Sequence, residues 1–161
     1  MLRFFSPKTL GRLTRIWMPI GKRVLIIGGA IHGCELAEFL VKRGRNVTIV
    51  HSGDRLGDGM TVDDQLRLFP WFKEKGVVSY TGVKYEEITD QGMAITSAKG
   101  ERLTLAADTI IPSIYLKQDL KLAAIIKGKV PEVYATGSYI QREPDLIVDA
   151  VAAGAAIAHQ V

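Results

Sequence analysis

Cysteine is almost missing from this 161-residue sequence, which contains only Cys34, and long apolar runs are missing altogether. One thiol cannot form an internal disulfide and offers no cluster of metal ligands, so we expect neither a disulfide scaffold nor a metal site. Scarce cysteine also favours a reducing compartment, with the cytoplasm as the expected location. The longest apolar stretches fall well short of the roughly 20 residues that a membrane-spanning helix needs, so no membrane partner is expected.

Acidic residues are missing from positions 1–23, where six of the 21 lysines and arginines lie. The rest of the chain therefore carries 15 basic and 17 acidic residues, and the formal net charge of +4 comes from this basic start. Such a start can mark a transit peptide or a nucleic-acid-binding arm. A helical arm over residues 1–21, packed through Leu10, Leu13 and Trp17, is favoured because no linker separates it from the first strand. We expect no nucleic-acid partner.

The whole composition, with 47% hydrophobic and 24% charged residues, is that of a chain that folds around a core. Arg23–Ile27 is a continuous apolar run, typical of a parallel strand that is buried on both faces. Asn46–Val50 is rich in β-branched residues and is expected to be a second strand. Between them, apolar residues follow helical spacing from Gly33 to a basic last turn. Residues 22–50 are therefore expected to form a βαβ unit.

The rest of the chain continues the alternation of strands and helices and adds one antiparallel piece. Turn sequences at 90–92 and 99–101 divide residues 83–105 into short strands, which predicts a small β-meander. The other expected elements are helices over Thr9–Trp17, Val62–Lys75 and Leu146–Val161 and strands over Val77–Tyr80, Asp108–Ile111 and Glu132–Ala135. The expected fold is α/β: a Rossmann-like three-layer arrangement of a parallel sheet with the small antiparallel meander.

A glycine-rich turn joins the first strand to the following helix. Dinucleotide-binding βαβ units carry G-x-G-x-x-G here: one glycine permits the sharp turn, another lets the backbone approach the pyrophosphate, and the last lets helix and strand pack closely. In this chain alanine, the smallest replacement, stands in place of the middle glycine. The helix N-terminus then offers unpaired N–H groups to the pyrophosphate. The candidate residues are Gly28, Gly29, Ala30, Ile31, His32 and Gly33.

Two interpretations of this turn stay open. It binds a dinucleotide, or it is a tight βα turn without a ligand, which Ala30 also suits.

The end of the second strand distinguishes NAD from NADP, since an Asp or Glu there binds the ribose 2′-hydroxyl. His51 and Ser52 stand at that place instead, and Arg55 follows shortly after. With no carboxylate to repel a 2′-phosphate, the pattern leans towards NADP(H), although Arg55 equally suits a solvated loop position.

The other reactive side chains have plainer explanations. Cys34 lies at a helix N-terminus, which favours a thiolate, but a buried packing cysteine without a resolving partner explains it better. His32 is expected to contact the cofactor or to cap the turn rather than to catalyse. Tyr80 and Lys84 match the Y-x-x-x-K pair of short-chain dehydrogenases, but that pair needs a helix, and none is expected here. A methyltransferase would need an acidic residue where His51 stands. We assign no catalytic residue.

Several stretches resemble the C-terminal region of the 2,4-dienoyl-CoA reductase, 2-enoate reductase and trimethylamine dehydrogenase family. They read WMPIGKRVLIIGG from position 17, GCELAEFLVKRG from position 33 and LIVDAVAAGAAIAHQV from position 146, and the similarity covers nearly the whole chain. The resemblance implies a pyridine-nucleotide domain over residues 22–112 and a returning segment of an FAD domain over residues 113–161. It also implies that Glu35, in a G-x-E helix start, lies near the cofactor.

In that family, electrons pass from NAD(P)H through flavins to an enoyl-type substrate. The returning segment there reads T-G-D, and its aspartate holds the flavin; this chain has Gly137 and Ser138 at the last two positions, which implies an altered FAD contact. The sequence contains neither the barrel domain and cluster cysteines of that family nor the first FAD-binding glycine motif. We therefore expect a fragment of a larger flavoprotein or a truncated relative.

The expected function is that of the NAD(P)H-binding domain of a flavin-dependent oxidoreductase, with FAD bound only in the full-length context. The other domains of such a flavoenzyme are the expected partners. The alternative is a stand-alone, non-catalytic nucleotide-binding module that docks on a flavoprotein partner. Whether the chain is itself an enzyme stays open at this stage.

Overall fold

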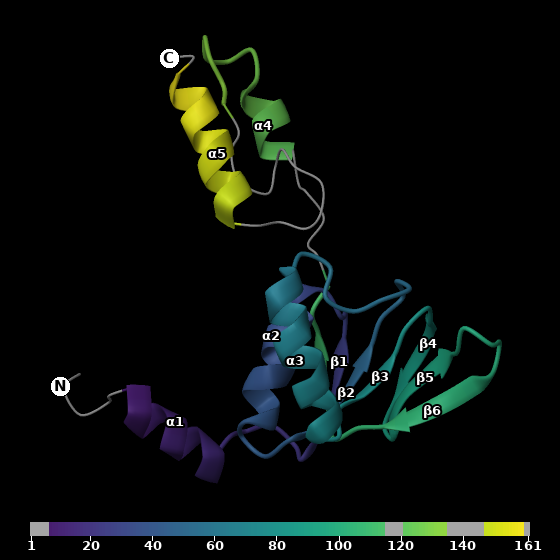
Figure 1. Ribbon diagram of the computed structural model, residues 1–161. Coiled ribbons are helices and arrows are strands. Elements are labelled where there is room, and N and C mark those ends of the chain that lie inside the picture. Colours follow the sequence, from purple (N-terminus) through teal and green to yellow (C-terminus); the bar gives the residue numbers. More distant parts are fainter. Residues whose placement is uncertain (1–6, 115–120, 135–146, 160–161) are drawn as a thin grey trace. The chain divides into compact units, whose positions relative to one another are not determined.

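The computed structural model describes residues 7–114, 121–134 and 147–159, which belong to two compact units, Met1–Ile114 and Tyr115–Val161 (Figure 1). The first unit contains a four-stranded parallel sheet with the order β3-β2-β1-β7. These strands are β1 (Arg23–Ile27), β2 (Asn46–Val50), β3 (Val78–Tyr80) and β7 (Thr109–Pro112). All four therefore end at the same edge of the sheet, where a Rossmann-like fold binds its ligand.

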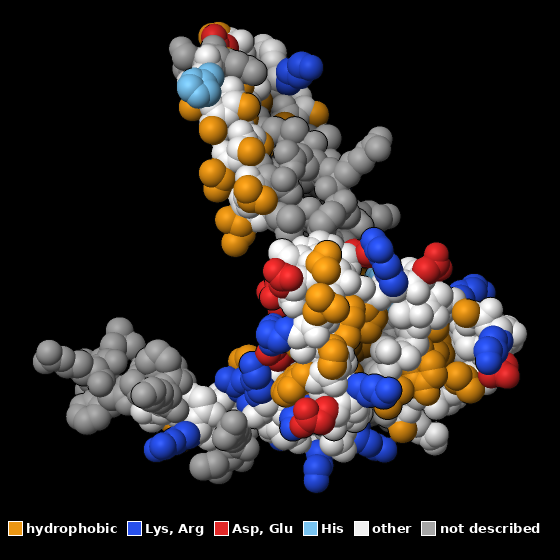
Figure 2. All heavy atoms as spheres, viewed as in Figure 1, with side chains coloured by type: hydrophobic (Ala, Val, Ile, Leu, Met, Phe, Trp, Pro, Cys, Tyr) orange, Lys and Arg blue, Asp and Glu red, His pale blue; other side chains and the backbone are white. Residues whose placement is uncertain are grey.

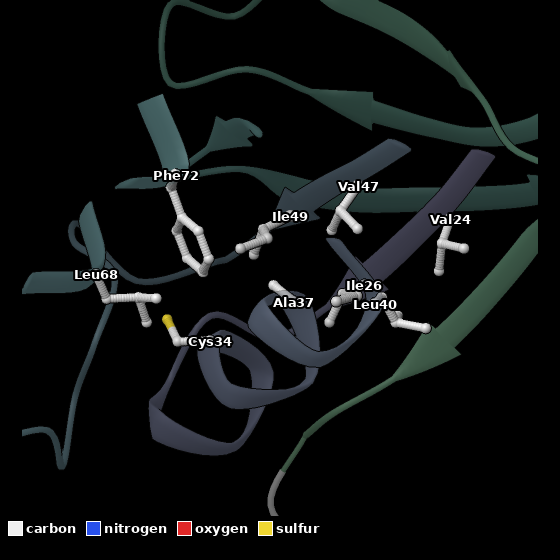
Figure 3. Close-up of a cluster of buried hydrophobic side chains, with 9 residues drawn as sticks. All are labelled: Val24, Ile26, Cys34, Ala37, Leu40, Val47, Ile49, Leu68 and Phe72. Atoms are coloured by element: carbon white, nitrogen blue, oxygen red, sulfur yellow. The ribbon is translucent and has the colours of Figure 1, made fainter. Parts of the chain in front are cut away.

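Two helices cover one face of this sheet: α2 (Ile31–Val41) and α3 (Val62–Glu74) (Figure 1). The Thr61 side chain accepts a hydrogen bond from the Asp64 N–H and so caps the start of α3. Figure 3 shows the apolar side chains that pack between these helices and strands β1 and β2. This first core cluster consists of Val24, Ile26, Cys34, Ala37, Leu40, Val47, Ile49, Leu68 and Phe72.

A three-stranded antiparallel meander covers the other face. Its strands, in the order β4-β5-β6, are β4 (Lys84–Thr89), β5 (Gly92–Thr96) and β6 (Arg102–Ala106). A second buried cluster joins the meander to the parallel sheet and contains Leu25, Ile27, Val50, Val83, Met93 and Ile95. Successive residues of β1 thus alternate between the two clusters, as a strand buried on both faces requires. The predicted three-layer α/β fold is confirmed.

The N-terminal helix α1 (Pro7–Ile16) precedes the first strand. The Arg43 guanidinium donates to the Thr14 hydroxyl across 3.0 Å, which links α1 to the end of α2. Trp17 is 76% exposed and Leu13 is 46% exposed, so the expectation that these two side chains pack on the domain is wrong. The side chain of Leu10, the third residue of this expectation, lies outside the part of the structure that is described.

The second unit contains the helices α4 (Lys121–Ile126) and α5 (Ile147–Ala158). The helix α5 lies within the predicted helix at the chain's end, whereas α4 was not expected. Residues 132–134 form no strand, because the described part of this unit supplies no neighbouring strand to pair with them. Gly137 and Ser138, the expected flavin contacts, lie outside the described residues. None of the described helices is long and apolar enough to cross a membrane.

Candidate functional site

The turn after β1 is packed so closely that glycine is required at two of its positions. Gly28 has φ +113°, and a Cβ built on it lies 2.1 Å from the backbone oxygen of Ser113, which directly follows β7. A Cβ on Gly33 lies 2.0 Å from the backbone oxygen of Gly28. These contacts involve backbone atoms, which no rotamer change can move away. The first and last glycines thus bring the turn, β7 and the start of α2 together.

Gly29 and Ala30 follow Gly28 and lead directly into α2. Gly29 faces the loop after β2, where an added Cβ would lie 2.3 Å from Cδ2 of Leu56. Ala30 is the N-cap residue, has extended backbone dihedrals and makes no side-chain cap. Its methyl group is almost completely buried, with 6% exposure, so alanine fits at the position where the fingerprint has its middle glycine. Because no side chain caps the start of α2, the first N–H groups of the helix need other hydrogen-bond acceptors.

One such acceptor comes from the loop that joins β2 to α3, residues 51–61, which we call the β2–α3 loop. The Ile31 N–H donates to the backbone oxygen of Asp58 across 2.8 Å, and the Gly57 N–H donates to the oxygen of Gly29 across 2.7 Å. Gly57 has φ +83°, a backbone conformation that lets the loop turn back towards the helix. The β2–α3 loop therefore lies across the first amide of α2.

His51 is the side chain that the β2–α3 loop presents to the glycine turn. Its Nδ1 accepts a hydrogen bond from the Gly29 N–H across 3.2 Å, so the neutral imidazole carries its proton on Nε2. Nε2 is buried and has no hydrogen-bond partner. An orphaned donor at this place is a feature that a ligand acceptor would satisfy. His51 thus occupies the strand-end position from which a nucleotide site contacts the adenosine ribose.

The start of the β2–α3 loop is also fixed from the meander side. The Ser52 N–H donates to the Tyr85 hydroxyl across 3.0 Å, and the Val83 N–H donates to the backbone oxygen of His51 across 3.2 Å. The Gly82 N–H donates to the backbone oxygen of Gly53 across 2.8 Å. Residues 51–53 therefore have their backbone groups held by the meander while the His51 ring points to the glycine turn.

Arg55, the expected partner of a 2′-phosphate, makes an ion pair within the loop. Its Nε lies 3.3 Å from Oδ1 of Asp58, and the Arg55 side chain is 85% exposed. Oδ2 of the same carboxylate lies 3.8 Å from Nε2 of His51. Asp58 was not predicted from the sequence, because the carboxylate of an NAD site is expected directly after the strand and Asp58 lies seven residues beyond His51. The signal that could have found it is the glycine pair Gly57 and Gly59, which permits the chain to turn back here.

The remaining candidates divide into buried and exposed residues. Cys34 is fully buried, donates from Sγ to the backbone oxygen of Gly29 across 3.3 Å, and has a thiol pKa that burial raises to about 11. It is a packing residue, as the sequence predicted. His32 and Glu35, which follow the turn on α2, are exposed. Tyr80 ends β3 and Lys84 begins β4, so this pair does not share a helix. The described residues hold no group of side chains that suits a metal ion.

Together, these features define a class of site: a parallel α/β sheet with a glycine-cradled helix start at the carboxyl ends of its strands. This is the arrangement of dinucleotide-binding proteins. The chain matches the sequence profile of the pyridine nucleotide-disulphide oxidoreductases over residues 4–154. It therefore belongs to the pyridine nucleotide-disulphide oxidoreductase family.

Two individual proteins with pyridine-nucleotide redox activities in their names are similar to this chain. The chain is 26% identical over 147 residues to NADH oxidase of Thermoanaerobacter brockii and 35% identical over 135 residues to rubredoxin-NAD(+) reductase of Acinetobacter baylyi. These alignments cover 87% and 72% of this chain but only 21% and 34% of the relatives. The chain thus spans about a fifth to a third of the length of these relatives.

Solved structures show the same relation. A 2-naphthoyl-CoA reductase in complex with 2-naphthoyl-CoA is 26% identical, with a TM-score of 0.71, and the match covers 85% of this chain and 21% of that one. Histamine dehydrogenase from Rhizobium sp. 4-9 has a TM-score of 0.74 at 17% identity, covering 98% of this chain and 24% of that one. The second likeness shows the fold alone.

Proposed function

We propose that this chain is the NAD(P)H-binding domain of a larger flavin-dependent oxidoreductase. The observation that carries the proposal is the glycine cradle at the carboxyl edge of the parallel sheet, where any Cβ on Gly28 or Gly33 would collide with backbone. These two glycines permit the sharp turn and the close packing that bring the start of α2 to this edge, and a helix N-terminus placed there attracts a pyrophosphate. The orphaned Nε2 of His51 beside the cradle supports the same ligand, because it lacks an acceptor.

Within this proposal, the pyrophosphate lies at the start of α2, over Ala30, Ile31 and His32. The Ile31 N–H already donates to the backbone oxygen of Asp58. A pyrophosphate oxygen that takes this amide must displace that carbonyl, so nucleotide binding includes a small shift of the β2–α3 loop. The adenosine ribose then lies at His51 and Ser52. Gly29 contributes its backbone to the cradle.

The nicotinamide end of the cofactor lies, in this proposal, towards Glu35, as the family resemblance implies. The sequence alone favours NADP(H), with Arg55 and His51 as partners of a 2′-phosphate, a preference that takes no account of Asp58. The bound flavin of the complete enzyme would accept a hydride from the nicotinamide. The described residues supply the nucleotide platform, and we assign none of them a catalytic role.

The second unit supports a place within a larger flavoprotein. Hydrophobic side chains gather along α5 in Figure 2, where Ile147 is 86% exposed and Val148 and Val151 are each 65% exposed. A helix that is apolar on its outer face is suited to burial against another domain. We propose residues 113–161 as a returning segment of an FAD domain, with Gly137 and Ser138 as altered flavin contacts and residues 22–112 as the nucleotide domain.

The finer identity is a proposal too. The sequence resembles the 2,4-dienoyl-CoA reductase family, and the similar 2-naphthoyl-CoA reductase is an enzyme whose name gives an acyl-CoA substrate. Both support an enoyl-type substrate for the complete protein. The scarcity of cysteine supports a place in the cytoplasm. The same exposed face of α5 also favours the alternative, a non-catalytic module that docks on a separate flavoprotein. Full-length flavin reduction by NAD(P)H would distinguish the first function from the second.

Isothermal titration calorimetry of the purified chain tests nucleotide binding itself. We expect NADH or NADPH to bind more tightly than FAD or S-adenosylmethionine, because the chain presents a nucleotide cradle but only the returning part of a flavin domain. Failure of both nicotinamide nucleotides to bind would refute the proposed function. Stoichiometric, micromolar binding of FAD would refute the division of the chain into a complete nucleotide site and an incomplete flavin site.

A further inference from the structure

A carboxylate lies beside both basic side chains that the sequence offers to a 2′-phosphate. Oδ2 of Asp58 is 3.8 Å from Nε2 of His51, and its Oδ1 is 3.3 Å from Nε of Arg55. The Asp58 side chain is 44% exposed, so its carboxylate remains open to a ligand. A negative charge therefore stands where an NAD site carries its ribose-binding carboxylate, although it comes from seven residues further along the chain.

The backbone fixes Asp58 in this place. The preceding Gly57 donates its N–H to the backbone oxygen of Gly29 across 2.7 Å, a bond that does not use the Ile31 amide and so is kept when a pyrophosphate takes that amide. The Gln65 side chain holds the same stretch by donating to the backbone oxygens of Gly57 and Met60. The fold thus presents the Asp58 carboxylate at the glycine turn, and its position does not depend on an unconstrained loop.

We propose that Asp58 determines the discrimination at the ribose 2′ position and favours NADH over NADPH. The inference rests on the proposed function, because it assumes that a nicotinamide nucleotide binds with its adenosine ribose at the end of β2. A 2′-hydroxyl is a donor and binds to the carboxylate. A 2′-phosphate offers acceptor oxygens and a charge of about −1.5 to −2, which the carboxylate repels.

Arg55 does not offset this repulsion. Its guanidinium is already paired with Asp58, and its side chain is 85% exposed, so water and salt screen its attraction for a phosphate. His51 gives Nδ1 to the Gly29 amide and points Nε2 towards Asp58. The lean of the sequence towards NADP(H) depended on a site without a carboxylate. Because the Asp58 carboxylate lies beside His51 and Arg55, that condition is not met. We therefore propose NADH in place of NADPH as the preferred nucleotide.

The test compares the dissociation constants of NADH and NADPH for the full chain and for Asp58→Asn, measured by calorimetry at low salt. Asparagine keeps the shape of the side chain and the backbone carbonyl that binds Ile31, and it removes only the charge. We expect the unchanged protein to bind NADH more tightly. The ratio of NADPH to NADH affinity should rise roughly tenfold in Asp58→Asn, the scale of removing a charge about 4 Å away in a partly solvated site.

Asp54→Asn is the matched control, because Asp54 is an exposed carboxylate of the same loop that belongs to neither of these ion pairs. The ratio of NADPH to NADH affinity should differ less than twofold between Asp54→Asn and the unchanged protein. Asp58→Ala, which also keeps the backbone carbonyl, should repeat the result of Asp58→Asn. An unchanged ratio in both Asp58 variants, or an equal change in Asp54→Asn, would overturn the inference while leaving nucleotide binding intact. Binding of neither nucleotide by the unchanged chain would refute the proposed function, and the inference with it.

Discussion

Replacing Gly33 with alanine should affect the stability of the fold in two opposite ways. Gly33 lies inside α2, where alanine is the better helix former by up to about 1 kcal/mol. The added Cβ, however, lies 2.0 Å from the backbone oxygen of Gly28. That distance is far below a normal contact, and the obstructing atom belongs to a turn that is itself fixed against Ser113. The helix and the turn must move apart for the variant to fold.

Overpacking of this kind costs typically about 1–3 kcal/mol, and the upper part of this range applies when backbone has to shift. After the helix-propensity gain, we expect Gly33→Ala to lose about 1–2 kcal/mol of unfolding free energy. For a chain of this size that corresponds to a fall in Tm of roughly 2–8 °C. Nucleotide affinity should fall as well, because the cradle opens.

The assay is urea unfolding followed by circular dichroism, which gives the midpoint and the slope m for each variant. Gly11→Ala is the control, because Gly11 lies in helix α1 and an added Cβ there meets nothing within 4 Å. It should leave stability unchanged or raise it by up to about 1 kcal/mol. A Gly33→Ala protein as stable as the parent, with the same m, would refute the close packing of Gly33 against the Gly28 backbone oxygen.

The remaining predictions concern charge and the thiol. Glu38 joins α2 to α3, and hydrogen bonds from Arg67 and then Lys42 lower the pKa of its carboxyl. Its contribution is therefore present above the unfolded pKa, about 4.3, and is lost as the pH falls through the lower folded pKa. Glu38→Gln should cost up to about 1 kcal/mol at pH 7 and progressively less below pH 4; a constant difference across a pH series of melts would contradict this. Cys34, with a thiol pKa of about 11 and complete burial, should react with a thiol reagent at pH 7.5 only after unfolding, and rapid labelling of the folded chain would disprove its packing role.

The central part of the fold could be predicted because its signals are local. The apolar run of β1 and the β-branched residues of β2 predicted strands at the bounds that the structure gives. Helix α3 was expected one residue longer than it is, and the meander followed from its turn sequences. Each signal depends on spacing within a single segment, and burial on both sides of the sheet reinforces it.

The parts that could not be predicted depend on contacts between distant residues. Asp58 reaches the site only because the β2–α3 loop turns back onto Gly29 and Ile31, which no spacing rule expresses. The exposure of Trp17 likewise depends on where helix α1 rests. In the second unit, the predicted strand at 132–135 is not formed at 132–134, because a strand exists only with a neighbour to bond to.

Amide chemical shifts of the isotope-labelled chain, recorded during titration with NADH, test nucleotide binding at the glycine turn most directly. We expect the largest shifts in two stretches: Gly28–Gly33 and the β2–α3 loop from His51 to Asp58. The Ile31 amide should change most, since it exchanges the Asp58 carbonyl for a pyrophosphate oxygen. Residues of β4 and β6 on the outside of the meander should stay unchanged. Saturating NADH that leaves the Gly28–Gly33 amides unshifted, or shifts only residues elsewhere, would contradict the assignment of this turn as the dinucleotide site.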